Sequence, residues 1–283
     1  MQYVMFTKHL QEWPLDKAAR VVKSLGFDGL DLTVRGGGFV LPENVKTGLP
    51  DALKIAADTG LTVPMLTTNI VDVATDNSAE LIDTAAACGV KELKLGYWTY
   101  RNYGEFVPAV QDAKVKLAAI AAAAGQAGVR VNLHIHSANF VTANPAVVWW
   151  LLQDLDPAVA GAYIDPGHMT IEGGKDVWRQ GLELLAPRTN LMAVKSMAWH
   201  FVPDASRSGI WQDRMYPLWR GMVDWVKVWQ CLAKSGFDGA VSVHSEYQGG
   251  HSWRDLTIDE VVDQTREDFA WLRACRDKAL AAE

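Results

Sequence analysis

The chain has 283 residues, 49% of them hydrophobic, and a formal net charge of −6 at pH 7. This composition supports a large buried core, and the acidic net charge gives no electrostatic indication of nucleic acid binding and disfavours it. No apolar segment approaches the roughly 20 residues of a membrane span, and the apolar run that begins at Met1 is too short for a signal peptide. Three widely spaced cysteines are typical of reduced thiols. We therefore expect a cytoplasmic protein with no nucleic acid or membrane partner.

One short pattern recurs along the chain: the end of a helix, a glycine and then a short apolar strand. It occupies residues 25–32, 59–66, 88–95, 127–133 and 235–243. Glycine directly after a helix suits the left-handed backbone of a helix C-terminus, so a strand begins just beyond it. Further strands are predicted near residues 3–6, 161–164 and 190–195. Eight strands, most of them spaced by roughly 30 residues as in βαβ units, predict a (β/α)₈ TIM barrel that forms one domain over residues 1–283.

The segments between these strands are predicted to be helices that cover the outside of the barrel. Apolar residues occur at helical spacing over residues 15–25, 52–59, 79–88 and 113–127, and a further helix is expected over 223–235. The last helix, over 257–282, opens with Thr257-Ile-Asp-Glu260, which has the pattern of a capping box.

One stretch, residues 196–221, fits neither a barrel strand nor an outer helix. It follows the seventh strand and is rich in tryptophan. A loop of this length inside a compact domain is usually functional or disordered. Because of its aromatic residues, we predict that it forms an ordered lid over the barrel mouth.

Every histidine of the chain falls at one end of the predicted barrel. In TIM barrels the active site lies at the C-terminal ends of the strands, and all the histidines end or follow a predicted strand there. They are His9, His134, His136, His168, His200, His244 and His251. A single histidine would more often be a structural residue, but their joint placement indicates a functional site.

Three of these strand ends provide side chains that can bind a metal. His134 and His136 share one face of a strand, because they are two residues apart, and His244 shares a face with Glu246. Asp165 ends another strand. His134, Asp165 and His244 would supply two imidazoles and a carboxylate, which suit Mn²⁺, Co²⁺, Fe²⁺ or Zn²⁺, with Mn²⁺ or Zn²⁺ favoured. Alternatively, these side chains only hydrogen-bond the hydroxyls of a sugar.

Three side chains are candidates for the chemistry itself. Glu246 could be a fourth metal ligand or a base, and His136 could remove a proton from a substrate or form a polar network with His168. Lys195 ends the seventh strand, where it could stabilise an enolate oxygen or form a salt bridge with Asp165 or Glu246. The sequence leaves these alternatives open.

Aromatic and basic side chains gather in the loops after the strands. Aromatic faces stack on the C–H faces of sugar rings, so these loops favour a small carbohydrate ligand. The candidate substrate contacts are His9, Arg35, Trp98, Trp199 and His251. For each aromatic residue alone, packing is the simpler explanation, and Arg35 could merely anchor its loop.

Residues 164–173, Ile-Asp-Pro-Gly-His-Met-Thr-Ile-Glu-Gly, look like the Asp-x-x-His motif on the sixth strand of the xylose-isomerase-like barrel superfamily. Residues 26–32 and 239–246 support this resemblance. Over essentially its whole length, the chain resembles the sugar phosphate isomerase and epimerase group, which includes the ketose 3-epimerases. The resemblance implies a TIM barrel, a divalent metal ion and a homo-oligomer, either a dimer or a tetramer.

In that family a divalent metal is held by Glu, Asp, His and Glu on strands five to eight, and the two glutamates move protons through a cis-enediolate. The resemblance implies that Asp165 corresponds to the family's Asp, and His168 to its histidine that contacts substrate. His134, Ala193 and His244 occupy the other three ligand positions. The ligand set is therefore divergent, although histidine can still bind a metal.

The resemblance leaves Glu246 as the replacement base, with Lys195 and His136 as its partners. The first hypothesis is a metal-dependent isomerase or epimerase that acts through an enediolate on a monosaccharide or sugar derivative. The second is a keto-glycoside lyase or hydrolase that uses the same enolisation step, and the third is a non-catalytic barrel that binds sugar. An endonuclease, which the superfamily also contains, is disfavoured by the acidic charge.

Overall fold

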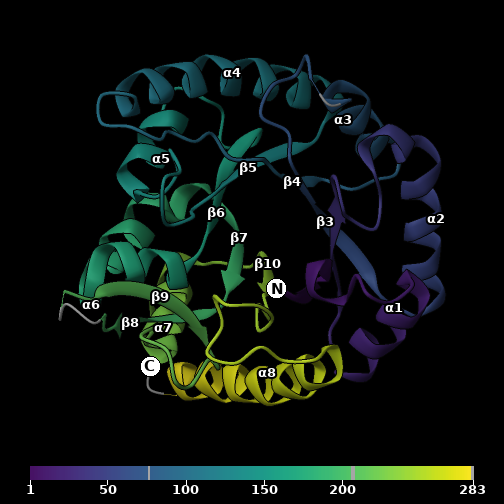
Figure 1. Ribbon diagram of the computed structural model, residues 1–283. Coiled ribbons are helices and arrows are strands. Elements are labelled where there is room, and N and C mark those ends of the chain that lie inside the picture. Colours follow the sequence, from purple (N-terminus) through teal and green to yellow (C-terminus); the bar gives the residue numbers. More distant parts are fainter. Residues whose placement is uncertain (76, 205–207, 282–283) are drawn as a thin grey trace.

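The computed structural model describes residues 1–75, 77–204 and 208–281. Within these residues, eight parallel strands close into a barrel in the order β1, β10, β7, β6, β5, β4, β3 and β2. The helices form a ring around the strands, as Figure 1 shows. The predicted (β/α)₈ TIM barrel in a single domain is therefore confirmed.

The barrel strands are β1 Gln2–Phe6, β2 Gly29–Val34, β3 Thr62–Thr68, β4 Glu92–Lys94, β5 Arg130–His134, β6 Ala160–Ile164, β7 Thr189–Val194 and β10 Ala240–Val243. The helices around them are α1 Leu15–Ser24, α2 Val45–Asp58, α3 Ser78–Ala87, α4 Phe106–Ala127, α5 Pro145–Leu152, α6 Pro166–Leu185, α7 Trp225–Ser235 and α8 Ile258–Leu280. None of these helices, nor any other among the described residues, is long and apolar enough to cross a membrane.

The barrel strands contribute to two separate apolar clusters, because successive side chains of a strand point to opposite faces. Side chains such as Leu30 and Leu32 pack under the helices in the main core. Side chains of the other face form a small cluster of Val4, Met65, Tyr163, Leu191, Ala193 and Ala240. This cluster fills the interior of the barrel, so polar functional groups lie above it, toward the C-terminal ends of the strands.

The sequence Gly-Phe-Asp-Gly, which occurs at residues 26–29 and 236–239, has the same structural role in both places. Its first glycine has a left-handed backbone, with φ of 90° at Gly26 and 70° at Gly236. Its last glycine lies against the backbone of the neighbouring strand. A Cβ atom on Gly29 would be 2.4 Å from the carbonyl oxygen of Thr62, and one on Gly239 would be 1.8 Å from that of Asn190. Each copy therefore requires glycine at both ends.

Two helices begin earlier than the sequence predicted. α2 begins at Val45 instead of residue 52, and α4 begins at Phe106 instead of residue 113. The first turns of α2 contain Gly48 and Pro50, which have low helix propensity, and α4 exposes Val107 near its start. The helical apolar pattern is therefore weak in these turns.

In place of an irregular loop, the described part of residues 196–221 forms regular strands, and its role as an ordered lid over the barrel mouth stays a prediction. Most of them form an antiparallel strand pair, β8 Ser196–Val202 and β9 Ile210–Tyr216, and residues 205–207 lie outside the described residues. The pair lies beside α6 at the edge of the barrel (Figure 1), where Met197 and Met215 pack against Ile171. Half-buried and exposed side chains alternate over residues 198–202 of β8, a strand pattern that the tryptophan-rich composition obscured.

A buried carboxylate anchors the segment after β9 to α8. Asp268 of α8 accepts hydrogen bonds from the backbone N–H of Leu218, at 2.9 Å, and from the hydroxyl of Tyr247. Burial raises the pKa of Asp268 to about 6, although the hydrogen bond from Tyr247 opposes this shift. The predicted capping box at the start of α8 is confirmed at Thr257 and Glu260.

We expect Asp268→Asn to change how the stability of the protein depends on pH. The pKa of Asp268 is higher in the folded protein than its ordinary value of 3.8. The wild type therefore loses stability as the pH rises through about 4 to 6, because the folded state must give up a proton that it holds more tightly. The side chain of Asn does not ionise. The free energy of unfolding of the variant, relative to that of the wild type, should therefore be higher at about pH 8 than at about pH 4 by roughly 1–3 kcal/mol. Urea denaturation at both pH values measures this, and an identical pH dependence in the two proteins would contradict it.

We also expect Gly239→Ala to destabilise the barrel strongly. The new methyl group would overlap the backbone of β7, which cannot move without disturbing the sheet, so the free energy of unfolding should fall by about 2–3 kcal/mol. The matched control is Gly36→Ala, because a Cβ atom on Gly36 meets no atom within 4 Å. The control substitution should change the free energy of unfolding by about 0.5 kcal/mol or less. Urea denaturation of both variants tests the contrast, and equal midpoints would refute it.

Candidate active site

A small cavity opens among the C-terminal ends of the barrel strands, with a volume of about 90 Å³. Its lining side chains lie at the end of, or in the loop after, every strand of the barrel. Those with ionisable groups are Lys8, Arg35, Lys94, Tyr97, His134, His136, Tyr163, Lys195, His244 and Glu246. This is the end of the barrel at which the sequence predicted the site.

Lys195, directly after β7, is paired with two carboxylates. Its Nζ lies 3.2 Å from Oδ2 of Asp165 and 3.0 Å from Oε1 of Glu246. Burial alone would raise the pKa of Asp165 and of Glu246, but the Lys195 ammonium holds the pKa of Asp165 below its ordinary value and that of Glu246 well below. Burial would likewise lower the pKa of Lys195, and the two carboxylates raise it instead. All three groups are therefore ionised, and the salt bridge that the sequence left open is formed to both acids.

The two histidines at the ends of β5 and β10 make contacts through both ring nitrogens. In His134, Nε2 lies 3.1 Å from Oδ2 of Asp165 and Nδ1 lies 2.6 Å from the hydroxyl of Tyr97. In His244, Nε2 lies 2.9 Å from the hydroxyl of Tyr163 and Nδ1 lies 3.4 Å from Oε1 of Glu246. Burial lowers the pKa of both imidazoles, which are therefore neutral at neutral pH.

Asp31 and Tyr163 extend this network toward the barrel interior, and the sequence analysis missed both. Asp31, in the middle of β2, accepts hydrogen bonds from Thr67 at 2.7 Å, from Ser242 at 2.8 Å and from Tyr163 at 3.3 Å. Burial raises its pKa. The available signal was an acidic residue alone in the otherwise uncharged strand Gly29–Val34, because a carboxylate in a buried strand needs partners.

Lys94 and Tyr97 form a second pair on the cavity wall. The Nζ atom of Lys94 lies 3.7 Å from the centre of the Tyr97 ring, and among the described residues it has no hydrogen-bond partner. Burial, followed by the nearby charge of Arg35, holds the pKa of Lys94 well below its ordinary value. The cavity therefore contains a buried amine whose N–H groups are available to a ligand.

The rings of His136 and His168 are in contact, with centres 3.9 Å apart and planes tilted by 33°. Nδ1 of His136 lies 2.9 Å from the carbonyl oxygen of Ser137, so this nitrogen carries the proton and Nε2 is the acceptor. Burial lowers the pKa of His136 to about 4. His168 lies deeper, with Nδ1 2.8 Å from Oγ of Ser137 and its backbone N–H donating to Asp165. Of the two, only His136 lines the cavity.

Of the predicted substrate contacts, Arg35 lines the cavity and the other five do not. Trp98 is buried and donates its indole N–H to the carbonyl of Val71. Trp199 lies on β8, and its indole N–H donates to the carbonyl of Ile171. Neither tryptophan lines the cavity, and Trp199 is 43% exposed. His9 is buried, edge-on against Phe6, and His251 is exposed in the loop after β10.

The predicted metal ligands converge, but their arrangement does not fit a metal ion. Among the described residues, no group of three or more His, Cys, Asp or Glu side chains is placed to hold one. Asp165, which would be the central ligand, is paired with Lys195, and both nitrogens of His134 have partners. A cation placed among His134, Asp165 and His244 would have to displace the Lys195 ammonium.

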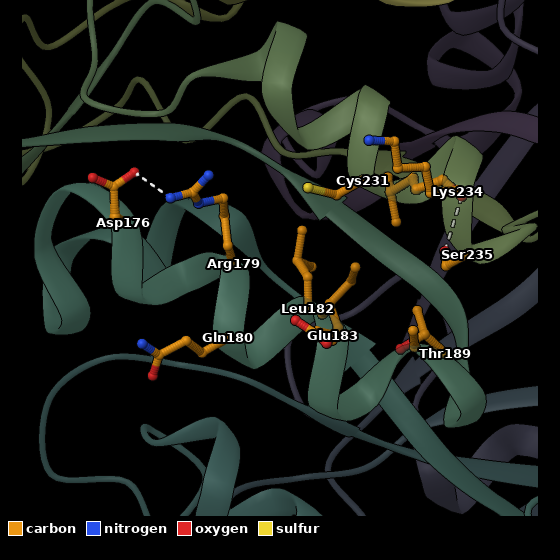
Figure 2. A pocket seen from close by; sticks show the side chains of 12 residues that line it. Asp176, Arg179, Gln180, Leu182, Glu183, Thr189, Cys231, Lys234 and Ser235 are labelled. Atoms are coloured by element: carbon orange, nitrogen blue, oxygen red, sulfur yellow. Dashed lines mark hydrogen bonds and ion pairs between the residues drawn. The ribbon is translucent and has the colours of Figure 1, made fainter. Parts of the chain in front are cut away.

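A larger hollow, of about 680 Å³, lies outside the barrel between α6 and α7. Figure 2 shows it with the ion pair of Asp176 and Arg179 and, across from it, Cys231 and Lys234. None of the candidate site residues that were predicted from the sequence lines it. The ionisable side chains that converge at the barrel mouth make the smaller cavity the candidate site.

Comparison of the whole fold with solved structures gives several similar proteins. D-psicose 3-epimerase, determined in the presence of D-fructose, is 15% identical with a TM-score of 0.73, and the match covers 98% of this chain and 99% of that one. The 3-keto-D-glucoside 4-epimerase from E. coli is 17% identical with a TM-score of 0.70, and the match covers 97% of this chain and 100% of that one. A xylose isomerase-like TIM barrel protein from Mycobacterium smegmatis, in complex with magnesium, is 13% identical with a TM-score of 0.66, covering 97% of each chain.

At these identities the likeness to the solved structures establishes the fold alone. No curated protein matches the chain significantly. The family model described as "Xylose isomerase-like TIM barrel" matches residues 19–275, which is most of the chain. The chain therefore belongs to the xylose isomerase-like TIM barrel family.

Proposed function

We propose that the chain is an isomerase or epimerase that acts on a sugar or sugar derivative by moving a proton next to a carbonyl group. The names of two similar structures, a D-psicose 3-epimerase and a 3-keto-D-glucoside 4-epimerase, support a carbohydrate substrate. The observation that carries the proposal is the pairing of Glu246 with Lys195 on the wall of the cavity, 3.0 Å apart. A carboxylate base beside a fixed positive charge is what enolisation requires.

In the proposed reaction, Glu246 takes the proton from the carbon next to the carbonyl. The electron pair of the broken C–H bond forms a C=C bond, and the carbonyl oxygen becomes an enolate oxygen, to which Lys195 donates a hydrogen bond. The low pKa of Glu246 makes it a weak base in the free protein. A sugar oxygen that accepts a hydrogen bond from the third N–H of Lys195 shares the charge of the ammonium and so weakens its effect on Glu246, which becomes a stronger base in the complex.

His136 is the second proton carrier in this proposal. Its Nε2 accepts the proton of the hydroxyl group next to the carbonyl, because its Nδ1 is committed to the carbonyl of Ser137. If His136 gives its proton to the original carbon on the side opposite Glu246, and Glu246 gives its proton to the hydroxyl oxygen, the product is an epimer. If Glu246 gives its proton to the former carbonyl carbon, and His136 gives its proton to the former carbonyl oxygen, the product is the isomeric sugar. Arg35, on the same wall, is the proposed substrate contact.

A divalent metal ion, with Mn²⁺ or Zn²⁺ favoured, stays a prediction from the family resemblance. Such an ion would supply positive charge at the carbonyl oxygen. The arrangement of His134, Asp165 and His244 does not fit it, and the steps above use only this chain's own side chains. A cytoplasmic location, a homodimer or homotetramer, and substrate contacts by His9, Trp98, His168, Trp199 and His251 likewise stay predictions.

The proposed function predicts exchange of a substrate hydrogen with solvent. We expect ketoses or keto-glycosides incubated with the protein in D₂O to take up deuterium at the carbon next to the carbonyl, as followed by ¹H NMR. A new epimer or isomer should appear together with the exchange. Exchange with release of an aglycone would instead support the keto-glycoside lyase or hydrolase, and binding without any exchange would indicate a non-catalytic barrel.

Substitution of the proposed base tests its role directly. We expect Glu246→Gln to lower the exchange rate by about 10²–10⁴-fold, because an amide cannot accept the proton. The matched control is Glu12→Gln, which removes an exposed carboxylate that bonds only Gln248 among the described contacts and does not line the cavity. Circular dichroism verifies that both variants fold. If the two variants exchange the substrate hydrogen equally fast, Glu246 is not the base.

A further inference from the structure

We propose that the Lys195 ammonium is the resident cation of this site and takes the place of a divalent metal ion. This inference deepens the proposed function and rests on it for the chemistry, but the occupancy of the site is tested separately. Lys195 and Asp165 have side-chain exposures of 2% and 0%, and that of Glu246 is 13%. Two carboxylates that are this deeply buried need a compensating positive charge, and the ammonium provides it at 3.2 and 3.0 Å.

The two carboxylate oxygens of Asp165, the central predicted ligand, are already engaged. Oδ2 of Asp165 lies 3.2 Å from Lys195 and 3.1 Å from His134, and Oδ1 accepts the backbone N–H of His168. A divalent ion binds carboxylate oxygen at roughly 2.0–2.6 Å. An ion at that distance from Oδ2 would meet the ammonium at close range, where two positive charges repel each other. Metal and ammonium therefore exclude each other.

The chain around Lys195 is built to let its side chain reach this position. A Cβ atom on Gly167, at the start of α6, would lie 2.9 Å from Cγ of Lys195 and 3.1 Å from Oδ1 of Asp165. Only glycine at this point lets the helix pass the lysine side chain without displacing it. The glycine within the Asp-Pro-Gly-His sequence therefore makes room for the buried ion pair.

An ammonium in this position can perform the electrostatic task of the reaction. A lysine ammonium has three N–H donors, and the two carboxylates account for two of them. The third is available to a sugar oxygen next to Glu246. As negative charge develops on that oxygen during enolisation, the fixed positive charge stabilises it. Lys195 gives up no proton in this step.

The first experiment measures metal in the wild-type protein. After dialysis against EDTA, we expect mass spectrometry to find less than about 0.1 mole of any divalent metal per mole of chain, with the exchange rate unchanged. Titration with Mn²⁺ followed by calorimetry should give no binding. Stoichiometric metal that survives dialysis, or exchange that EDTA abolishes and Mn²⁺ restores, would overturn the inference.

The second experiment removes the ammonium. We expect Lys195→Met to bind one Mn²⁺ per chain, because Asp165 and Glu246 lose their shared cation and a metal ion can then take the position of the ammonium between their oxygens, 3.2 and 3.0 Å away before either side chain adjusts. Mn²⁺ should then raise the melting temperature of the variant but not that of the wild type. The matched control is Lys8→Met, which removes a half-exposed lysine 3.8 Å from Oε2 of Glu246 and leaves Lys195 in place. The control should not bind Mn²⁺.

The outcomes separate this inference from the proposed function. If the wild type binds no metal and the variant gains it, Lys195 is the resident cation even when no sugar is turned over, and only the proposed function fails. If both lysine variants respond to Mn²⁺ alike, the inference fails whatever the activity. If Lys195→Met does not fold without metal but refolds when Mn²⁺ is added, the result supports the inference. If it refolds under neither condition, the metal content of the dialysed wild-type protein decides the case.

Discussion

The arrangement of the barrel mouth depends on how one buried carboxylate is neutralised. Asp165 lies at the end of β6, where an uncompensated charge would be strongly destabilising. Its oxygens are shared by Lys195 after β7, by His134 at the end of β5 and by the backbone N–H of His168 in the first turn of α6. One carboxylate therefore connects three neighbouring strands and caps a helix. The position of Lys195, and with it the charge in the cavity, follows from this requirement.

The polar network at the barrel mouth lies directly above the apolar cluster in the barrel interior, and the two have different roles. Below, the interior cluster that includes Met65 and Leu191 closes the barrel and excludes water. Above it, the Asp31 carboxylate and the Tyr163 hydroxyl connect to His244, and His244 lies beside Glu246. Because each group has a partner on a different strand, the proposed base is positioned by the whole sheet. A site built in this way is rigid before any ligand binds.

The sequence was sufficient to predict the barrel, because glycines mark the points where five of the helices end and the next strand begins, as at Gly26 and Gly236. It also predicted that His134, His244 and Lys195 meet, since strand ends converge in a closed barrel. It could not decide whether Lys195 pairs with Asp165 or leaves room for a metal, because that depends on distances of a few tenths of an ångström. The role of Trp98 was equally undetermined, since an aromatic ring suits both packing and sugar binding.

An ammonium in place of a divalent metal changes how a sugar can be oriented. A divalent ion with open positions can bind two neighbouring sugar oxygens at once, whereas Lys195, with two N–H groups directed at carboxylates, offers a single donor. The remaining donors must come from elsewhere on the cavity wall. Arg35 and Lys94 line the same cavity, and the amine of Lys94 has no hydrogen-bond partner among the described residues. In this barrel the orientation of a substrate would therefore depend on side chains of β2 and β4, while the charge that stabilises an enolate comes from β7.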